Sequence, residues 1–152
     1  VMAAYYDLDS VGKKVVMVGS GLTACEVALH LANNGHDVTV LCRRDMMAYE
    51  TFGYYRNALL DAMDARGIHQ MLKTKTLSIA KDGVTVEKDG EKFVVPADTV
   101  IYSTGIRPDA AAVEELKALA GEIPVKVIGD ALASGKMGDA VRGGYMAAME
   151  IV

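Results

Sequence analysis

The chain has 152 residues, of which 51% are hydrophobic and 24% are charged, an ordinary composition for a globular protein of one domain or slightly more. The net charge of −4 and the lack of a basic block count against nucleic acid as a partner, and no apolar run is long enough to span a membrane. Cys25 and Cys42 lie far apart in the sequence and suggest no disulfide framework, so we expect a cytoplasmic protein.

The first strand and the turn after it carry the clearest signal. Residues 14–18 are mostly β-branched and apolar, which predicts a buried parallel strand. The strand ends at Gly19-x-Gly21-x-x-Ala24, and an apolar segment of helix length, residues 22–33, follows at once. Gly19 permits a tight turn, Gly21 allows the backbone to approach a pyrophosphate, and Ala24 allows helix and strand to pack closely.

The next elements complete a parallel α/β unit. Asn33-Asn34-Gly35 provides a helix C-cap, and a strand at residues 38–41 completes a strand–helix–strand unit of the expected length. The glycine pattern therefore has the context that makes it specific for a dinucleotide. The sequence then predicts a helix at residues 54–66 and a third parallel strand at residues 68–72.

The hydrophobic period changes after residue 72. Short apolar runs near residues 77–79, 84–86 and 93–95 are separated by turns at Lys81-Asp82-Gly83 and Lys88-Asp89-Gly90, which predicts an antiparallel β-meander. The expected fold class is therefore α/β, a Rossmann-type parallel sheet with an inserted antiparallel β-meander. Beyond the meander, the pattern predicts strands at residues 99–102 and 125–128, a helix at residues 110–120 and a last helix from about residue 139 onward.

These motifs and their order resemble one superfamily of flavoproteins. Gly19-x-Gly21-x-x-Ala24-x-Glu26 is followed by the meander, by Ser103-Thr104-Gly105-x-x-Pro108 and by Val127-Ile128-Gly129-Asp130. The arrangement resembles the pyridine-nucleotide-disulfide oxidoreductase superfamily, whose members have two dinucleotide-binding domains. The run from Ile128 to Tyr145 is most similar to the C-terminal half of the old-yellow-enzyme-like 2,4-dienoyl-CoA reductases and enoate reductases, which are NADH:flavin oxidoreductases.

The resemblance implies a domain organisation. In such proteins an NAD(P)-binding domain is inserted into an FAD-binding domain, which has its own glycine fingerprint upstream. This chain has one fingerprint and lacks the flavin barrel and the iron–sulfur cysteines of the family. We therefore expect residues 13–108 to form the NAD(P)-binding domain and residues 1–12 and 109–152 to be flanking remnants of a split FAD-binding domain. The start at Val1 also leads us to expect a fragment, inactive alone, whose partners are the remaining flavin domains of the parent chain.

The resemblance also implies a function. The parent would be an FAD-dependent oxidoreductase that passes hydride from a nicotinamide to a flavin and reduces an activated alkene. In this family the cofactors perform the chemistry, and no residue of this chain stands out as an acid, a base or a nucleophile. Neither cysteine belongs to a Cys-x-x-Cys pair, which counts against a redox-active disulfide, and the three histidines lack metal-ligand spacing.

The candidate cofactor-binding residues lie at strand ends and at one helix start. By resemblance, Glu26 faces the nicotinamide, the backbone of Ser103-Thr104-Gly105 lies beside the dinucleotide, and Gly129-Asp130 meets the ribityl chain of the flavin. The alternatives are a solvated or capping role for Glu26, plain turn chemistry at residues 103–105 and a helix-leading aspartate at position 130. The glycine turn and the helix start contribute Gly19, Ser20, Gly21, Leu22, Thr23 and Ala24.

The residues after the second strand point to NADP(H). An NAD-type fingerprint places Asp or Glu about twenty residues past the glycines. Cys42, Arg43 and Arg44 stand there instead, and the first carboxylate is Asp45. Because an arginine fork suits a 2′-phosphate, we expect NADP(H) to be favoured over NAD(H), and FAD to be bound only by the full-length parent. The alternative for this run is an exposed basic loop without a role in binding.

Two other classes of function are compatible with the glycine turn. One is a regulatory or structural module that binds an ADP-like group without reducing it. The other is a small-molecule transferase, such as a methyltransferase, although its usual acidic residue at the end of the second strand is absent.

Overall fold

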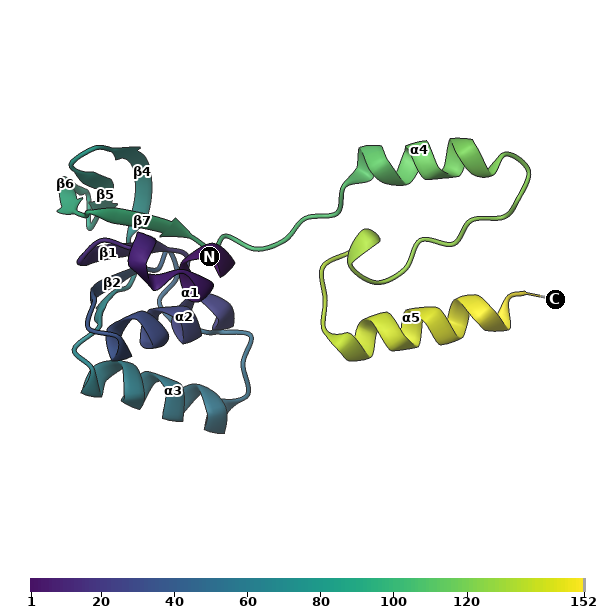
Figure 1. Cartoon of the computed structure of the whole chain (residues 1–152). Helices are drawn as coiled ribbons and strands as arrows, with labels where there is room; N and C mark the ends of the chain where they lie inside the picture. The colour runs from purple at the N-terminus through teal and green to yellow at the C-terminus, as the bar shows by residue number, and fades with distance from the viewer. Residues whose placement is uncertain (152) are drawn as a thin grey trace. The chain divides into compact units, whose positions relative to one another are not determined.

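The computed structural model describes residues 1–151, and these fall into two compact units (Figure 1). The first unit spans Val1–Thr104, and the second begins at Gly105. The first unit holds every strand of the described residues, whereas the second holds helices and connecting segments.

A four-stranded parallel sheet forms the centre of the first unit. Its strands lie in the order β3-β2-β1-β7, and each neighbouring pair is parallel. β1 and β2 are rich in valine, whose branched side chain suits a strand that is covered on both faces. The strands are β1 (Lys14–Val18), β2 (Asp37–Leu41), β3 (His69–Met71) and β7 (Thr99–Tyr102).

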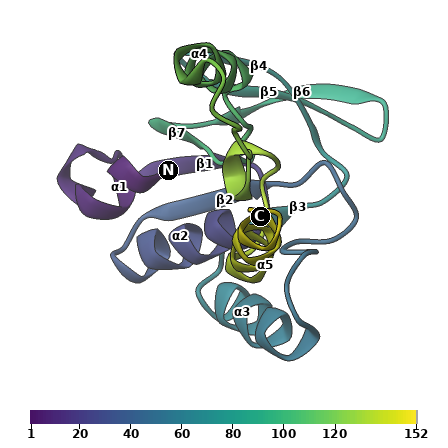
Figure 2. The ribbon, with the colours of Figure 1, turned by 90° about the vertical axis from the view of Figure 1, so that its right-hand side faces the viewer.

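Helices cover one face of this sheet. α2 (Leu22–Asn33) and α3 (Gly53–Ala65) lie on the same side of it, as Figures 1 and 2 show. Val15 and Met17 of β1 point to this face and are fully buried against α2. The α2 residues of this helix-side core are Ala24, Cys25, Val27, Ala28 and Leu31.

An antiparallel β-meander covers the other face. Val16 of β1 and Leu41 of β2 are buried together with Val84, Val86 and Val95 of the meander. Because side chains alternate along a strand, the parallel sheet packs against helices with one set of residues and against the meander with the other. The meander strands are β4 (Lys75–Ala80), β5 (Gly83–Lys88) and β6 (Glu91–Pro96), paired in that order.

The first residues of the chain pack with the first unit. They form a short helix, α1 (Met2–Tyr6), and a 3-10 turn at Leu8–Ser10. The ring centroid of Tyr5 lies 4.4 Å from that of His30 on α2, and Val11 belongs to the helix-side core. The assignment of residues 1–12 to an FAD-binding domain, and of residues 13–108 to an NAD(P)-binding domain, concerns the whole protein and stays a prediction.

The second unit consists of two helices and the segments around them. α4 spans Ala110–Ala120 and begins after Asp109, whose Oδ1 accepts a hydrogen bond from the Ala112 N–H at 3.1 Å. A 3-10 turn at Gly129–Ala131 precedes α5 (Met137–Met149). None of the described residues 105–151 is buried, so the second unit has no core of its own.

The α/β fold class predicted from the sequence is confirmed, and so are most elements. α2, α4 and β7 have the predicted bounds, α3 lies one residue earlier, and the three strands of the meander are present. One predicted element is wrong: residues 125–128 do not form a strand. Ile128 is extended, at φ −136° and ψ 169°, but no strand of the second unit lies beside this segment, so its N–H and C=O groups cannot form a ladder.

Candidate functional site

The ends of three strands meet at one edge of the parallel sheet. Val18 is the register partner of Leu41 on one side and of Tyr102 on the other. The Gly19 N–H donates to the Leu41 carbonyl at 3.2 Å, and the Ser103 N–H donates to the Val18 carbonyl at 2.8 Å. The chain leaves β1 for β2 on one side, while β7 lies on the other, so this edge is a switch point of the kind where open α/β sheets bind ligands.

Gly19 is required by the fold at this edge. Its φ is +111°, which other residues rarely adopt, and a Cβ at this position would lie 2.2 Å from the Ser103 carbonyl oxygen. The glycine therefore permits the loops after β1 and β7 to touch. Its role is in the structure of the site, as the sequence predicts for a tight turn.

Gly21 faces open space two residues later. Its backbone is extended, at φ −67° and ψ 174°, and a Cβ there would meet nothing within 4 Å. It is the N-cap of α2 and offers no side chain to the free N–H groups of Leu22, Thr23 and Ala24. An exposed turn of this shape, with free donors and the positive end of a helix dipole, fits a pyrophosphate.

Ser20 and Cys42 connect the glycine turn to the loop after β2. The Ser20 hydroxyl donates to the Cys42 Sγ at 2.9 Å, and that thiol donates to the Met46 carbonyl at 3.4 Å. Cys42 is fully buried, so its thiol stabilises this loop from the interior. The sequence predicts Cys42 among the cofactor-binding residues; its side chain is buried beneath the loop and is not exposed at the sheet edge.

Arg43 and Arg44 are exposed immediately after β2. The Arg44 backbone carbonyl accepts a hydrogen bond from the Lys73 N–H at 2.9 Å, which fixes the backbone of this loop. The Arg44 Cζ lies 3.5 Å from the ring centroid of Tyr49, in a cation–π contact. The sequence pattern does not predict this contact; the signal for it is an aromatic residue shortly after an arginine pair.

Cys25 lies under the glycine turn and is fully buried. Its thiol contacts the Ser20 carbonyl at 3.6 Å. The pKa of this thiol is raised to about 11, mainly because burial disfavours the thiolate. A hydrogen bond with the Ala48 backbone lowers the pKa by a smaller amount, and the nearby Cys42 and Glu26 raise it slightly. The thiol is therefore protonated at neutral pH, and Cys25 serves packing rather than nucleophilic chemistry.

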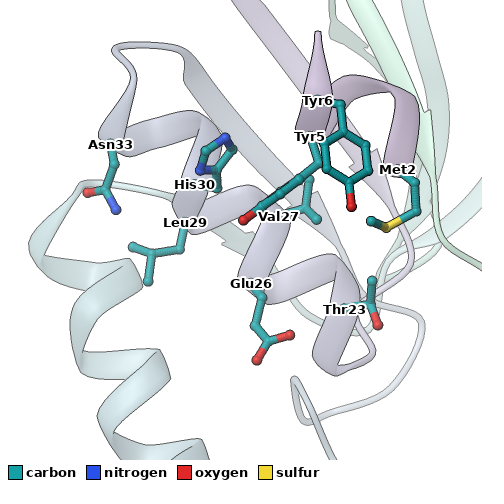
Figure 3. Close-up of a pocket in the computed structure, with 9 residues that line it drawn as sticks. All are labelled: Met2, Tyr5, Tyr6, Thr23, Glu26, Val27, Leu29, His30 and Asn33. Atoms are coloured by element: carbon teal, nitrogen blue, oxygen red, sulfur yellow. The ribbon is translucent and has the colours of Figure 1, made fainter. Parts of the chain in front are cut away.

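Glu26 is exposed on α2 and has a partner on α3. The Tyr55 hydroxyl donates to Glu26 Oε1 at 2.6 Å, and this hydrogen bond raises the pKa of Tyr55. The sequence did not point to Tyr55, because the contact joins residues 29 positions apart. Glu26 also borders an open hollow of about 590 Å³ between α1 and α2 (Figure 3). The hollow is lined by Met2, Tyr5, Tyr6, Thr23, Glu26, Val27, Leu29, His30 and Asn33.

The remaining predicted site residues divide between the two units. Ser103 and Thr104 follow β7 and lie at the edge already described. Gly105, Gly129 and Asp130 belong to the second unit. There, Asp130 is exposed, and its Oδ1 accepts a hydrogen bond from the Gly135 N–H at 3.2 Å. The structure thus brings together the glycine turn, the arginine loop and the end of β7.

Residues 1–151 contain neither a candidate metal site nor a helix that could span a membrane. Within that range, no three His, Cys, Asp or Glu side chains are grouped so that they could hold a metal ion. No helix among the same residues is both long and apolar enough to cross a membrane.

Comparison with known proteins gives one family and several relatives. The family described as "Pyridine nucleotide-disulphide oxidoreductase" matches residues 3–129. The "NADH oxidase" of Thermoanaerobacter brockii is 31% identical over 152 residues, which cover 99% of this chain and 23% of that protein. The chain thus spans about a quarter of the length of this relative.

Solved structures show the same fold at lower identity. A 2-naphthoyl-CoA reductase in complex with 2-naphthoyl-CoA has a TM-score of 0.76 and 23% identity, covering 98% of this chain and 23% of that one. An engineered water-forming NADPH oxidase bound to NADPH has a TM-score of 0.60 and 22% identity, covering 84% of this chain and 28% of that one. At these identities the likeness concerns the fold alone.

Proposed function

The chain belongs to the pyridine nucleotide-disulphide oxidoreductase family, and from that premise we propose that it is the NAD(P)H-binding part of an FAD-dependent oxidoreductase. The observation that carries the proposal is the sheet edge where the open Gly21 turn, the loop after β2 and the end of β7 lie side by side. A nicotinamide dinucleotide bound there supplies hydride for transfer to a flavin.

The residues of this edge have distinct roles in the proposal. The free N–H groups at the start of α2 bind the pyrophosphate, and Gly21 leaves room for it. Ser103 and Thr104 form the wall of the site on the β7 side. Glu26, held by the Tyr55 hydroxyl on the exposed side of α2, is proposed to face the nicotinamide.

We further propose that NADP(H) is preferred over NAD(H). Arg43 and Arg44 are exposed at the position where an NAD-type fingerprint has a carboxylate, and guanidinium groups bind a 2′-phosphate with paired, charge-assisted hydrogen bonds. The engineered NADPH oxidase carries substitutions that remove an aspartate and introduce two arginines. This chain likewise has arginines and no carboxylate at residues 42–44.

The whole protein is proposed to contain further flavin-binding parts. No residue of the second unit that the structure describes is buried, which supports the view that this unit completes its fold against other parts of a longer protein. Gly129 and Asp130 would contribute to an FAD site there, and this chain alone is not expected to hold FAD tightly or to be active. The motifs of the C-terminal segment favour a parent that reduces an activated alkene, such as an enoate or a dienoyl-CoA.

One ligand screen tests the proposal. Calorimetry of the purified chain against NADP, NAD, ADP, FAD and S-adenosylmethionine should show binding of the nicotinamide dinucleotides, with NADP the tighter. Binding of ADP without any contribution of the nicotinamide half would favour a regulatory nucleotide module. Binding of S-adenosylmethionine alone would favour a transferase, and a yellow preparation with stoichiometric flavin would contradict the proposed FAD boundary.

A further inference from the structure

We propose that Tyr49 is a positioning residue which selects the 2′-phosphorylated dinucleotide by holding the Arg44 guanidinium in place. The proposal deepens the function proposed above and rests on it. It starts from one contact: the Arg44 Cζ lies 3.5 Å from the centroid of the Tyr49 ring. Both side chains are exposed at the surface, so the contact is available to a ligand at the sheet edge.

The geometry of this stack leaves the hydrogen-bond donors of Arg44 free. All N–H groups of a guanidinium lie in its plane and point outward from its edge. The Arg44 Cζ lies over the tyrosine ring at 3.5 Å from its centroid, a separation typical of two planar groups stacked face to face. In that arrangement the ring covers one face of the guanidinium and leaves its edge open. A phosphate can therefore be bound in the plane of the guanidinium while the ring holds that plane in a fixed orientation.

The tyrosine itself is held by the loop that carries it. Ala48, the residue before it, is fully buried, and its N–H donates to the Ser20 carbonyl at 2.8 Å. The Thr51 N–H donates to the Ala48 carbonyl at 3.0 Å, and the Tyr49 hydroxyl is hydrogen-bonded to Glu50. These bonds fix the ring relative to the turn that contains Gly21.

The same bonds connect two parts of the dinucleotide site. Ser20 belongs to the glycine turn that is proposed to bind the pyrophosphate. Its carbonyl accepts the hydrogen bond from the Ala48 N–H, and Tyr49 is the next residue along the chain. An unrestrained arginine loses rotamer entropy when it binds a phosphate. Because Tyr49 orders the Arg44 side chain before the ligand arrives, less rotamer entropy is lost on binding. The gain applies to the adenosine 2′-phosphate, since that is the group that Arg44 is proposed to bind.

The experiment uses two small probes that differ only in this phosphate. Calorimetry at fixed salt compares 2′,5′-ADP with 5′-AMP for the full chain, for Tyr49→Leu and for Tyr49→Phe. For an exposed cation–π contact, we expect Tyr49→Leu to weaken 2′,5′-ADP binding roughly two- to fivefold and to leave 5′-AMP binding unchanged. Tyr49→Phe keeps the ring and the backbone bonds of Ala48 and loses only the hydroxyl bond to Glu50, so it should bind 2′,5′-ADP more tightly than Tyr49→Leu does.

A cycle with Arg44 separates positioning from structure. In an Arg44→Ala background, Tyr49→Leu should have no further effect on the affinity for 2′,5′-ADP. In the unmodified chain, the NMR signal of the Arg44 Nε–H should lie at the ring-shifted position that a stacked guanidinium has, and it should move when 2′,5′-ADP is added. This readout needs no variant and holds even if Tyr49→Leu fails to fold.

Several results would overturn the proposal. Equal weakening of both probes would show that Tyr49 only supports the loop, and tighter binding of 2′,5′-ADP by Tyr49→Leu would show that the stack withholds Arg44 from the ligand. An effect that persists in the Arg44→Ala background would exclude action through Arg44. If the unmodified chain binds neither probe, the proposed function fails as well, whereas normal binding without dependence on Tyr49 refutes this inference alone.

Discussion

Two glycines in the turn after β1 have different physical roles. Gly19 has a left-handed backbone and no room for a Cβ, because the Ser103 carbonyl oxygen would lie 2.2 Å away. Gly21 has an ordinary extended backbone and open space around it. Gly19 is therefore required by the fold, whereas Gly21 is free to serve the proposed binding of a pyrophosphate.

A valine at position 19 should mainly affect stability, whereas a valine at position 21 should mainly affect NADP binding. Gly19→Val should lower the free energy of unfolding by at least about 1–3 kcal/mol, the cost of a strained backbone, with the clash against Ser103 in addition. Gly21→Val should cost about 1 kcal/mol or less, since it only replaces an N-cap glycine. It should nevertheless abolish NADP binding, because the side chain occupies the space of the pyrophosphate. Urea unfolding and calorimetry measure the two effects, and a folded Gly21→Val protein with normal NADP affinity would contradict the proposed site.

The arginine pair should determine which nicotinamide dinucleotide binds. If each charge-assisted contact to the 2′-phosphate is worth about 1.5–3 kcal/mol, loss of one weakens NADP binding roughly ten- to a hundredfold. We expect Arg43→Ala combined with Arg44→Ala to erase the preference for NADP and to leave NAD binding almost unchanged. Calorimetry at fixed salt is required because ions screen the phosphate contacts. Tighter binding of NAD than of NADP by the unmodified chain would refute the preference.

Cys25 should make the stability of the chain sensitive to alkaline pH. Burial raises the pKa of its thiol from 9.0 to about 11, so both folded and unfolded chains carry the proton at neutral pH. Above pH 9 the unfolded chain loses this proton first, and the folded state loses stability as the pH rises towards 11. Urea unfolding should show a smaller loss between neutral and alkaline pH for Cys25→Ala than for the unmodified chain. Parallel pH profiles would mean that the thiol is not buried as described.

Among the elements, the meander is an integral part of the first unit. Val84, Val86 and Val95 are buried against Val16 and Leu41 of the parallel sheet. The sheet edge that forms the site thus depends on packing from both faces. A defect in the meander should weaken the whole first unit.

A matched pair of valines tests this packing. Val86 is fully buried, whereas Val94 on the neighbouring strand is 43% exposed. Val86→Ala should lower the free energy of unfolding by roughly 1.5–3 kcal/mol, through lost apolar burial and a small cavity. Val94→Ala should cost less than about 1 kcal/mol, the range of strand propensities. Urea unfolding of both variants measures the difference, and equal costs would argue against a meander packed on the parallel sheet.

The sequence predicted those elements whose signal is local. α2 lies between a glycine turn and an Asn-Asn-Gly cap, and its bounds were found from those residues alone. The segment at residues 125–128 also has an apolar pattern, but a strand needs a neighbour, and the described residues of its unit contain none. Strand formation there depends on residues far away, which a local pattern does not contain.

The candidate site shows the same division. The spacing of Gly19 and Gly21 after the first strand is visible in the sequence. In the structure Gly19 makes the tight turn, and Gly21 leaves open space beside the backbone. The hydrogen bond from Tyr55 to Glu26 and the indirect position of Cys42 come from tertiary packing, so the sequence pattern did not predict them. Tyr49 was close to Arg44 in sequence, but only the fold of the loop shows that they stack.

For the molecule as a whole, the two units differ in how they are stabilised. The first has buried clusters on both faces of its sheet, and the second has no buried residue among those described. Binding energy for a dinucleotide is therefore expected from the first unit, whose rigid strands position the site. The proposed flavin-binding residues, Gly129 and Asp130, lie in the unit that lacks a core.

An NMR titration of the isotope-labelled chain with NADP would locate the dinucleotide site residue by residue. We expect saturable shifts of the amides in three stretches, residues 19–24, 42–49 and 103–104, which are separate in sequence and meet at one edge of the sheet. Amides of α4 and α5 should stay unchanged. Saturable shifts confined to the second unit, or no shifts at millimolar NADP, would contradict the claim that the edge formed by β1, β2 and β7 is the dinucleotide site.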